Sequence, residues 1–451
     1  METSTTRLLL FTNKLGYQTR SFEEAARKHG AEILYVTDRC HQLEDPWGDR
    51  AIAVHFEAPQ AAAAAVVEVL RVKKIDGLLT LGDAPSVAAA YVARELGMAF
   101  NHPASVEACR SKLRLREIFR EAGLRTPWFR AMAIDPIPEP SLLGITYPCV
   151  LKPLSLSASR GVIRANNRDE FIAAAQRIRH LLESPEIRAT REPNLDRILV
   201  EGYIPGREVA VEGLVTDGAL RILAIFDKPD PLEGPYFEET IYVTPSRLSE
   251  AQQNAIERCA VECARAVGLT HGPVHAEFRI NCEKAGDTAV WPLEIAARPI
   301  GGLCARSLAF VGDLTTEKET RAESIGLEEL LLRHAMGLPG SDWVRERRAS
   351  GVMMIPVPHS GILEVIDGEA AARRTYGITE LLITARLHDY IAAWPEGSSY
   401  LGFLFAKAET PVDVEQILRQ AHAELHFTLA PRLAVQHPAQ QVASRSGGNR
   451  D

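Results

Sequence analysis

The sequence predicts a mixed α/β protein that begins with a parallel α/β domain and continues with antiparallel hairpins. In the first part of the chain, apolar strands alternate with helical segments, which is the pattern of a parallel sheet. Further on, apolar runs are joined by short turn sequences, which is the pattern of hairpins. With 451 residues the chain is long enough for about three domains.

Residues 1–104 are expected to form the parallel α/β domain. Its predicted strands are 7–12, 31–37 and 76–81, and its predicted helices are 19–29, 59–74 and 84–96. The stretches 13–16 and 82–85 follow the first and the third of these strands. Ligands of parallel α/β domains usually lie at the carboxyl ends of the strands, so both stretches are expected to border a site.

Two further regions, 105–200 and 201–345, are expected to follow. A long charged helix at 104–122 opens the first of them, and Gly123 is its stop signal. The later elements are expected, in order, as strand 147–153, a second strand after a loop, helix 168–183, a polar loop at 184–196, strands 197–204 and 208–215, helix 249–267, an acidic hairpin at 275–299 and helix 326–336.

The region 346–432 is expected to be a separate β-rich module. Its strands are predicted within 349–358, 378–386 and 399–409, and its helix at 411–424. The polar stretch 433–451 is expected to be a disordered tail.

The composition argues against several classes of protein. The net charge of −8 gives no support for nonspecific binding to nucleic acid. The chain has no apolar run of about 18 residues, so no membrane span is expected. Its seven cysteines are scattered without a CxxC pair, which fits reduced thiols. A cytoplasmic protein without a nucleic-acid or membrane partner is therefore expected.

Two carboxylates of the acidic hairpin are predicted to face each other. If Ala285-Gly286 is the turn, Glu277 lies directly opposite Glu294. Two negative charges at that position repel each other, but a divalent cation such as Mg²⁺ bound between them would make the arrangement favourable. Arg298 follows on the same strand and places a fixed cation nearby, a pattern that suggests phosphoryl or acyl-phosphate chemistry. The alternative is an exposed hairpin whose acids pair with neighbouring basic residues.

A second candidate site combines a strand lysine with a loop of small residues. Lys152 lies within the apolar strand YPCVLKP, where a lysine is costly unless it meets an anion. The loop after it, 155–161, can bring backbone N–H groups close to phosphate oxygens. A serine-rich surface hairpin with a snorkelling lysine is the alternative. The loop residues that we expect at the phosphate are Ser157, Ser159, Arg160 and Gly161.

Nucleotide binding, if present, must use an unusual scaffold, because the chain contains neither GxGxxG nor a Gly-Lys pair. The segment ILVEGYIPGREV supplies a candidate wall for an adenine pocket. Backbone groups of Glu201, Tyr203 and Ile204 are expected to meet the base edge, and Glu208 to accept from ribose hydroxyls. The alternative is a plain hairpin with solvated acids.

Taken in their order along the chain, these segments resemble the motifs of the ATP-grasp superfamily, and within it those of the carboxylate–amine ligases of the L-amino-acid ligase type. The resemblance extends from about residue 5 to about residue 430, and five motifs in the correct order make it specific. The matching segments are 109–127 for the entry helix, 147–153 for the second lysine, 155–162 for the phosphate-covering loop, 200–208 for the adenine and ribose strand, and 293–302 for the metal strand.

The resemblance implies roles for individual residues. Lys112 and Lys152 would hold the nucleotide's phosphates, and Arg298 would stabilise the acyl phosphate and the tetrahedral intermediate. Glu277 and Glu294 would hold Mg²⁺, or Mn²⁺ in its place. The sequence departs from the family pattern in two places, with Ala296 where many members have Asn and Ala158 where Gly is common.

His275 would point into the same site and contact phosphate or the carboxylate substrate, although a hydrogen-bonded strand histidine is the plain alternative.

The loop 226–246 and the pair Gly301-Gly302 are candidates for substrate contacts. Lys228 is expected to reach a phosphate or a carboxylate, and Glu238 or Glu239 to receive a substrate ammonium. The glycine pair would leave space for the entering amine, or would simply form a turn. Ordinary surface charge on a long loop is the alternative for the three charged residues.

By this resemblance the fold is an ATP-grasp fold, and the activity is ATP-dependent joining of a carboxylate and an amine through an acyl phosphate. The substrates would be small molecules, amino acids among them, and family habit suggests a homodimer. One alternative is a biotin-carboxylase-like or purine-pathway ligase that acts on bicarbonate or formate. Another is a nucleotide-binding regulator without catalysis.

Overall fold

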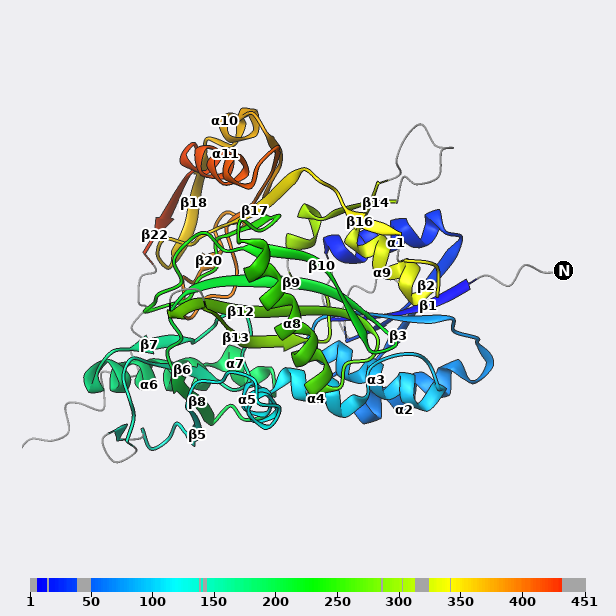
Figure 1. The fold of residues 1–451 in the computed structure, drawn as a ribbon, viewed down its shortest axis with the longest axis horizontal. Helices are drawn as coiled ribbons and strands as arrows, with labels where there is room; N and C mark the ends of the chain where they lie inside the picture. The colour runs from blue at the N-terminus through cyan, green and yellow to red at the C-terminus, as the bar shows by residue number, and fades with distance from the viewer. Residues whose placement is uncertain are drawn as a thin grey trace, which may run out of the picture.

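The computed structural model describes residues 6–13, 16–38, 50–137, 139–140, 144–284, 287–301, 303–312, 324–340 and 342–431. A central eight-stranded sheet dominates the molecule, with the N-terminal parallel sheet at one end and a smaller four-stranded sheet below it (Figure 1). The fold is thus mixed α/β, parallel first and antiparallel later, as the sequence predicted.

The N-terminal sheet is parallel throughout, in the order β3-β2-β1-β4. The predicted strands and helices of this domain are confirmed. The missed strand is β3, which has only three residues and is too short to show a periodic pattern. The elements are β1 (Thr6–Thr12), α1 (Tyr17–Lys28), β2 (Ala31–Thr37), β3 (Ala51–Ala53), α2 (Pro59–Val69) with a 3₁₀ turn (Leu70–Val72), β4 (Gly77–Leu81) and α3 (Asp83–Leu96).

The long helix expected at 104–122 is divided in two, so that prediction was wrong in part. Helix α4 (Pro103–Arg110) ends where α5 (Lys112–Glu121) begins, with the extended residue Ser111 between them. The Ser111 hydroxyl accepts a hydrogen bond from the N–H of Arg114, as an N-cap does. The break makes Lys112 the first residue of a new helix.

The small sheet is antiparallel, in the order β5-β8-β6-β7, and α6 covers it. Helix α6 was predicted at its observed bounds, whereas the expected polar loop at 184–196 contains a short helix, α7. Ser184 caps that helix and Pro185 opens it, so a start signal was present in the sequence. The elements are β5 (Phe129–Ala133), β6 (Cys149–Pro153), β7 (Ile163–Ala165), α6 (Arg168–Glu183), α7 (Pro185–Ala189) and β8 (Arg197–Gly202).

The central sheet has the order β13-β12-β9-β10-β11-β17-β21-β19. Helix α8 crosses one face of it (Figure 1) and begins with a capping box at Ser249. The elements of its first half are β9 (Arg207–Thr216), β10 (Ala219–Asp227), β11 (Ile241–Thr244), α8 (Glu250–Val267), β12 (Gly272–Lys284) and β13 (Asp287–Ala296).

The expected C-terminal module is not separate, because three of its strands belong to the central sheet. Strands β17 (Ala349–Ile355), β21 (Gly402–Ala408) and β19 (Ile378–Ile383) continue it from β11, and α11 (Pro411–Ala423) packs against β17 and β21. A second, small sheet contains β18 (Gly361–Asp367), β20 (Tyr390–Ile391) and β22 (His426–Ala430), beside α10 (Glu369–Arg374). The expected tail at 433–451 lies outside the described residues.

A small three-stranded sheet connects the central sheet to the N-terminal domain. It contains β14 (Ala309–Gly312), β15 (Ser324–Gly326) and β16 (Trp343–Arg345), after a 3₁₀ turn (Cys304–Ser307). Helix α9 (Leu327–Ala335) packs against α1 and ends near Gly337, which has φ +68°. Of the helices in the described parts of the chain, none is long and apolar enough to cross a membrane.

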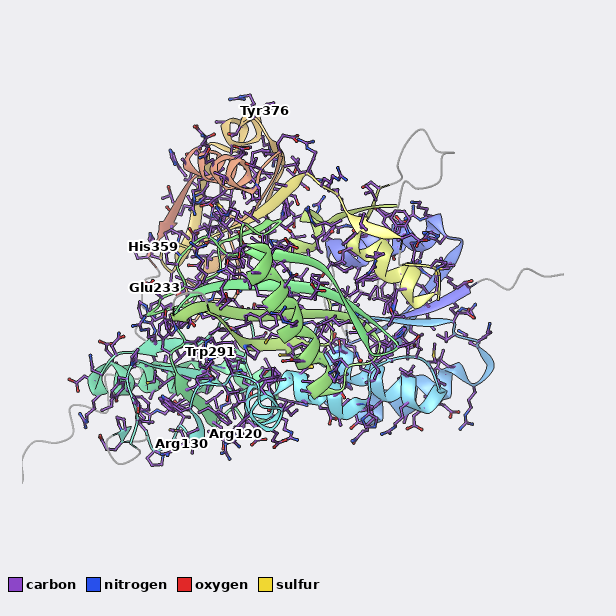
Figure 2. The ribbon with its side chains drawn as sticks, in the orientation of Figure 1. Arg120, Arg130, Glu233, Trp291, His359 and Tyr376 are labelled. Carbon is purple, nitrogen blue, oxygen red and sulfur yellow. The ribbon has the colours of Figure 1, made fainter. Side chains whose placement is uncertain are left out.

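The loop between β10 and β11 joins the central sheet to the small sheet. The sequence predicted a long loop at 226–246, but β10 and β11 occupy its two ends. The N–H of Arg164 donates to Pro235 at 2.9 Å, and its guanidinium donates to the carbonyl of Glu233 at 2.8 Å. Figure 2 shows Glu233 between His359 of the C-terminal region and Arg130 of the small sheet.

The Pro205-Gly206 turn between β8 and β9 requires its glycine. Gly206 has φ +116°, and a Cβ atom there would lie 2.2 Å from the carbonyl oxygen of Ile280. We therefore expect Gly206→Ala to destabilise the protein by more than about 1 kcal/mol, measured as a lower midpoint of thermal unfolding. Gly312→Ala is the control, because a Cβ there meets nothing within 4 Å. Equal midpoints for the two variants would contradict the expectation.

Candidate active site

A cavity of about 700 Å³ lies between the small sheet, the central sheet and the N-terminal domain. It brings together most of the residues that the sequence analysis singled out. Those that line it are Lys112, Lys152, Ser157, Ser159, Glu201, Tyr203, Ile204, Glu208, Glu239, His275, Glu277, Glu294, Arg298 and Gly301. Arg160, Gly161, Lys228 and Glu238 do not line it, and Gly302 lies outside the described residues.

Lys112 and Lys152 reach the same end of the cavity from different elements. The ammonium of Lys112, on α5, donates a hydrogen bond to the carbonyl of Leu156. Lys152, on β6, lies 2.5 Å from a carboxylate oxygen of Glu201. Burial lowers the pKa of Lys112, and the charge of Glu294 opposes that shift. Two ammonium groups therefore give this end of the cavity the positive charge that an anion requires.

A buried guanidinium that the sequence analysis missed lies behind Lys152. Arg116 is 2% exposed, and its Nε and Nη2 donate to the two oxygens of Glu201 at 2.7 and 3.2 Å. Its Nη1 donates to the carbonyl of Leu293 at 2.8 Å. Arg116 lies one helical turn after Lys112, and that spacing was the available signal. Burial alone would raise the pKa of Glu201, but Arg116 and Lys152 lower it to about 2.

The loop at 155–161, which is expected to cover phosphates, divides into two parts. Residues 157–159 face the cavity, whereas Arg160 and Gly161 turn away from it. Arg160 pairs with Glu186 at 3.1 Å, and the N–H of Gly161 donates to the carbonyl of Pro395 at 2.8 Å. The expected phosphate contact of Arg160 therefore finds no support in its placement, because its charge is already paired with the protein.

The segment after β8 leaves one backbone donor available to a ligand. The N–H of Tyr203 donates to Pro148 at 3.0 Å, and the carbonyl of Ile204 accepts from Arg279 at 2.7 Å. Among the described residues, the N–H of Ile204 has no hydrogen-bond partner. Ile204 also lines the cavity, so its N–H can meet the edge of a base.

Three carboxylates converge on the ammonium of Lys228, which is 8% exposed. Lys228 lies 2.8 Å from Glu208 and 3.1 Å from Glu277, and it also bonds Glu239. The other oxygen of Glu208 accepts from Arg279 at 2.9 Å. An exposed loop with ordinary surface charge is therefore the wrong description of Lys228. Both oxygens of Glu208 are engaged, so a ribose contact would have to share them.

Glu239 and Glu238 differ in their access to the cavity. Glu239 lines it and accepts a hydrogen bond from the Tyr242 hydroxyl at 2.9 Å. Burial raises the pKa of Glu239 to about 7, although Lys228 opposes the shift. Glu238 does not line the cavity and accepts from the N–H of Val357 at 3.4 Å. Of the two, Glu239 is the better placed to meet a ligand.

The predicted pairing of Glu277 with Glu294 is confirmed: the two residues are Cα partners across β12 and β13. At the other end of the hairpin Lys284 pairs with Asp287. Two register shifts lie between this pair and the Glu277–Glu294 pair, and they cancel each other, so the predicted register is kept at both ends. Glu294 makes no hydrogen bond or ion pair with any described residue, and it is partly buried at the cavity wall. An unpaired carboxylate opposite a second carboxylate fits a divalent cation.

His275 is held by a buried acid that the sequence analysis did not identify. Its Nδ1 lies 3.1 Å from Glu212, which is fully buried and directly opposite it on β9. The other oxygen of Glu212 accepts from the N–H of Ile300 at 3.0 Å. Nε2 of His275 lies 3.8 Å from Glu277. His275 is therefore both a hydrogen-bonded strand histidine and a cavity residue.

Arg298 is oriented by the N-terminal domain. Its Nε donates to Asp83 at 2.6 Å, and Asp83 lies in the stretch 82–85 that was expected to border a site. Burial would lower the pKa of Arg298, but Asp83 raises it, so the guanidinium stays charged. Of the stretch 13–16 that was also expected to border a site, Gly16 lines the cavity, together with residues 17–20 of α1.

The shifted pKa of Glu201 makes a prediction about stability at low pH. Its carboxyl has a pKa of about 2 in the folded protein, below the ordinary value of 4.5. The ionised form therefore stabilises the fold above pH 4.5, and this contribution is lost as the pH falls from 4.5 towards 2. We expect Glu201→Gln to lower the midpoint of thermal unfolding at neutral pH. Between about pH 5 and pH 3, where carboxyl groups ordinarily titrate, the midpoint should fall less steeply in the variant than in wild type.

If the unfolding midpoints of wild type and variant fell in parallel with pH over that range, the ion pairs of Glu201 would not make this contribution to stability. Glu117→Gln is the control, because among the described residues Glu117 pairs with Arg114 alone, on the surface of α5.

Comparisons with known proteins agree with this geometry. Residues 145–307 match the family model of the ATP-grasp domain, and residues 353–430 match that of L-amino acid ligase C-terminal domain 2. The crystal structure of L-amino acid ligase from Bacillus licheniformis superposes with a TM-score of 0.75 at 25% identity, covering 94% of this chain and 99% of that one.

Matches to curated relatives cover less of the chain. An uncharacterized protein y4rH of Sinorhizobium fredii is 23% identical over 75% of this chain and 65% of its own length. The ATP-grasp enzyme fsqD of Aspergillus fumigatus is 24% identical over 62% and 53%, and alanine–anticapsin ligase of Bacillus subtilis is 23% identical over 50% of each. The chain spans about half to two thirds of the length of these relatives. The chain therefore contains an ATP-grasp domain and a C-terminal domain of the L-amino acid ligase type, in a fold similar to that of a solved L-amino acid ligase.

Proposed function

We propose that the protein is an ATP-dependent carboxylate–amine ligase, which forms an amide bond through an acyl phosphate and releases ADP and phosphate. The observation that carries the proposal is the cavity itself. One space is lined by two lysines, a loop of small residues, two facing glutamates and an arginine, contributed by separate elements. These are the groups that phosphoryl transfer followed by acyl transfer requires.

The nucleotide would lie between the small sheet and the central sheet. Lys112 and Lys152 would hold its phosphates under residues 157–159, and the free N–H of Ile204 would donate to the base. Glu277 and Glu294 would hold Mg²⁺, or Mn²⁺, which neutralises phosphate charge when bound. Lys228 and His275 keep Glu277 ionised: burial alone would raise its pKa, but their charges lower it well below 4.5.

The reaction would have two steps. A carboxylate oxygen of the acid attacks the γ-phosphorus, the bond to the bridging oxygen breaks, and ADP leaves. The amine nitrogen then attacks the acyl carbon, and the carbon–oxygen bond to phosphate breaks. Arg298, held by Asp83, would stabilise the negative charge that develops on the carbonyl oxygen. The space beside Gly301, where a Cβ would meet nothing within 4 Å, suits an entering amine.

The end of the cavity away from the lysines supports an amino acid with an apolar side chain as one substrate. Glu239 lines the cavity, and an ammonium there would share its two oxygens with Lys228 and Tyr242. The surrounding wall is largely apolar, which favours a hydrocarbon or aromatic side chain. Its apolar and aromatic members are Tyr242, Leu303, Cys304, Met354, Leu382, Tyr400 and Phe403.

This wall bears on the rival functions. Bicarbonate and formate have no side chain, so a ligase for either of them would not use an apolar end of the cavity. The match of residues 353–430 to an L-amino acid ligase domain also favours amino acids, because strands from that region supply part of the wall. A regulator without catalysis would have no need of the facing glutamates and Arg298.

The proposal is tested by ADP release with Mg-ATP across a matrix of amino acids. We expect release that requires both an acid and an amine and is greatest with apolar side chains. Glu294→Gln should lower the rate by about 100-fold or more, because it removes one of the two facing carboxylates. Glu117→Gln on the surface of α5 should not change it. ATP binding without turnover across the matrix would support the regulator instead.

The apolar end makes a separate prediction about specificity. Leu382 lies on β19, an edge strand, where a larger side chain can be accommodated without disrupting the sheet. We expect Leu382→Trp to raise KM for a bulky apolar amino acid by about 10-fold or more and to leave KM for ATP unchanged. Leu387→Trp is the matched control, because Leu387 is 49% exposed and does not line the cavity. An unchanged amino-acid KM in the first variant would place the substrate elsewhere.

A further inference from the structure

The C-terminal region binds the phosphate-covering loop directly. We name residues 394–396 the latch segment, because each of its three residues bonds residues 158–161 of the loop. The bonds are Trp394 Nε1 to the carbonyl of Ala158 at 3.2 Å, the N–H of Gly161 to the carbonyl of Pro395 at 2.8 Å, and Arg160 Nε to the carbonyl of Glu396 at 2.6 Å.

These contacts hold the loop in an unusual backbone conformation. Ala158 and Ser159 have φ values of +56° and +54°, in the left-handed region that non-glycine residues rarely adopt. Such conformations persist only where the surroundings enforce them. The latch segment is part of those surroundings, since it bonds the carbonyl of Ala158 and the N–H of Gly161.

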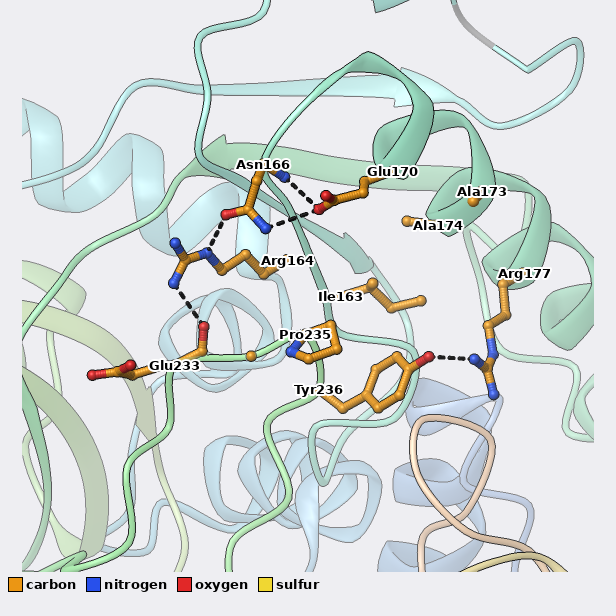
Figure 3. A pocket seen from close by; sticks show the side chains of 11 residues that line it. Ile163, Arg164, Asn166, Glu170, Ala173, Ala174, Arg177, Glu233, Pro235 and Tyr236 are labelled. Carbon is orange, nitrogen blue, oxygen red and sulfur yellow. Dashed lines mark hydrogen bonds between the residues drawn. The ribbon is translucent and has the colours of Figure 1, made fainter.

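A single arginine connects the latch segment to two other parts of the molecule. Arg177, on α6 of the small sheet, forms a two-pronged pair with the carboxylate of Glu396, in which Nη2 lies 2.8 Å from Oε2. The same guanidinium donates to the hydroxyl of Tyr236, in the loop between β10 and β11 (Figure 3). Arg177 thus joins the small sheet, that loop and the C-terminal region.

The cavity of about 620 Å³ beside Tyr236 does not itself indicate a ligand. Its polar side chains bond one another: Arg164 donates to Asn166, and Asn166 donates to Glu170 (Figure 3). The inference therefore rests on the contacts of Arg177 with the latch segment and with Tyr236, and not on this cavity.

The other side of the latch segment leads to the substrate end of the active site. The ring of Trp394 packs on Tyr400, with centroids 4.9 Å apart, and residues 398–400 line the main cavity. A short stretch of chain therefore touches the phosphate-covering loop at one end and the amino-acid end of the cavity at the other.

We propose that Glu396 is a positioning residue for the ligase reaction: through Arg177 and the backbone of the latch segment, it holds the covering loop over the phosphates of ATP. This inference rests on the proposed function. The C-terminal region would then have two roles: it would line the amino-acid pocket, and it would fix the loop that encloses the nucleotide. Enclosure matters because an open loop admits water to a reactive acyl phosphate.

The test is a charge exchange between the two partners. Arg177→Glu and Glu396→Arg should each raise KM for Mg-ATP roughly 10-fold and increase ADP release without amide formation, because the loop is no longer fixed over the phosphates. The double variant restores opposite charges at the same positions and should recover most of both properties. If the Arg177–Glu396 pair only stabilised the fold, the single variants would have lower thermal stability, and their ratio of amide to ADP would be that of wild type.

A matched control lies on the same helix. Arg168 forms a similar two-pronged pair with Glu139, at 2.9 and 2.6 Å, and touches neither the covering loop nor the latch segment. Arg168→Glu should leave KM for Mg-ATP and the amide to ADP ratio at wild-type values. Equal effects of Arg168→Glu and Arg177→Glu would overturn the proposal, as would failure of the double variant to recover.

A binding measurement separates this proposal from the proposed function. The affinity for a nonhydrolysable ATP analogue needs no turnover, and it should fall roughly 10-fold in each single variant and recover in the double variant. If wild type binds the analogue and all variants bind it equally, the positioning role is wrong while the ligase proposal stands. If wild type does not bind it, the ligase proposal fails and this inference fails with it.

Discussion

The active site depends on a buried ionic cluster centred on Glu201. Arg116 and Lys152 both bond this carboxylate, and Arg116 also holds the carbonyl of Leu293, the residue before Glu294. The cluster therefore connects Lys152, on β6, to the strand that carries Glu294. Burying three charges is costly, and only mutual pairing with good geometry offsets that cost. Removing one member would leave an uncompensated charge in the interior.

The same principle recurs at three other charged groups in or beside the cavity. His275 is held by Glu212, Arg298 by Asp83, and Lys228 by three glutamates. Glu212 on β9, Asp83 on α3, and Glu208 and Glu277 on β9 and β12 come from other elements than the groups they hold, so tertiary packing sets the orientation of those groups. Groups fixed in this way need little rearrangement when charge develops during a reaction, which is the main contribution that a ligase of this kind makes.

Local patterns predicted the parts of the site that lie on single elements. The apolar strand around Lys152 and the register of the hairpin that pairs Glu277 with Glu294 follow from spacing alone, and both are confirmed. The resemblance added Lys112 and the order of the motifs. The break at Ser111 was missed because a serine within a run of good helix formers is weak evidence of a cap, although its hydroxyl does accept from Arg114.

Partners distant in the sequence were beyond such reasoning. Arg116 and Glu201 are separated by 85 positions, and Asp83 and Arg298 by 215. No local pattern distinguishes a paired buried charge from a solvated one. The sharing of the central sheet by the C-terminal region was missed for the same reason, since strand order across β11 and β17 is a tertiary property. The turned-away placement of Arg160 likewise depends on Glu186 and the latch segment.

In the proposed reaction, a substrate carboxylate is activated by phosphorylation in this cavity. The most direct measurement follows ¹⁸O from a labelled carboxylate substrate into the products. Transfer of one labelled oxygen into the released inorganic phosphate is the result that an acyl phosphate predicts, because the carbon–oxygen bond breaks when the amine attacks. Label that appears in AMP, or phosphate that carries no label, would contradict the account.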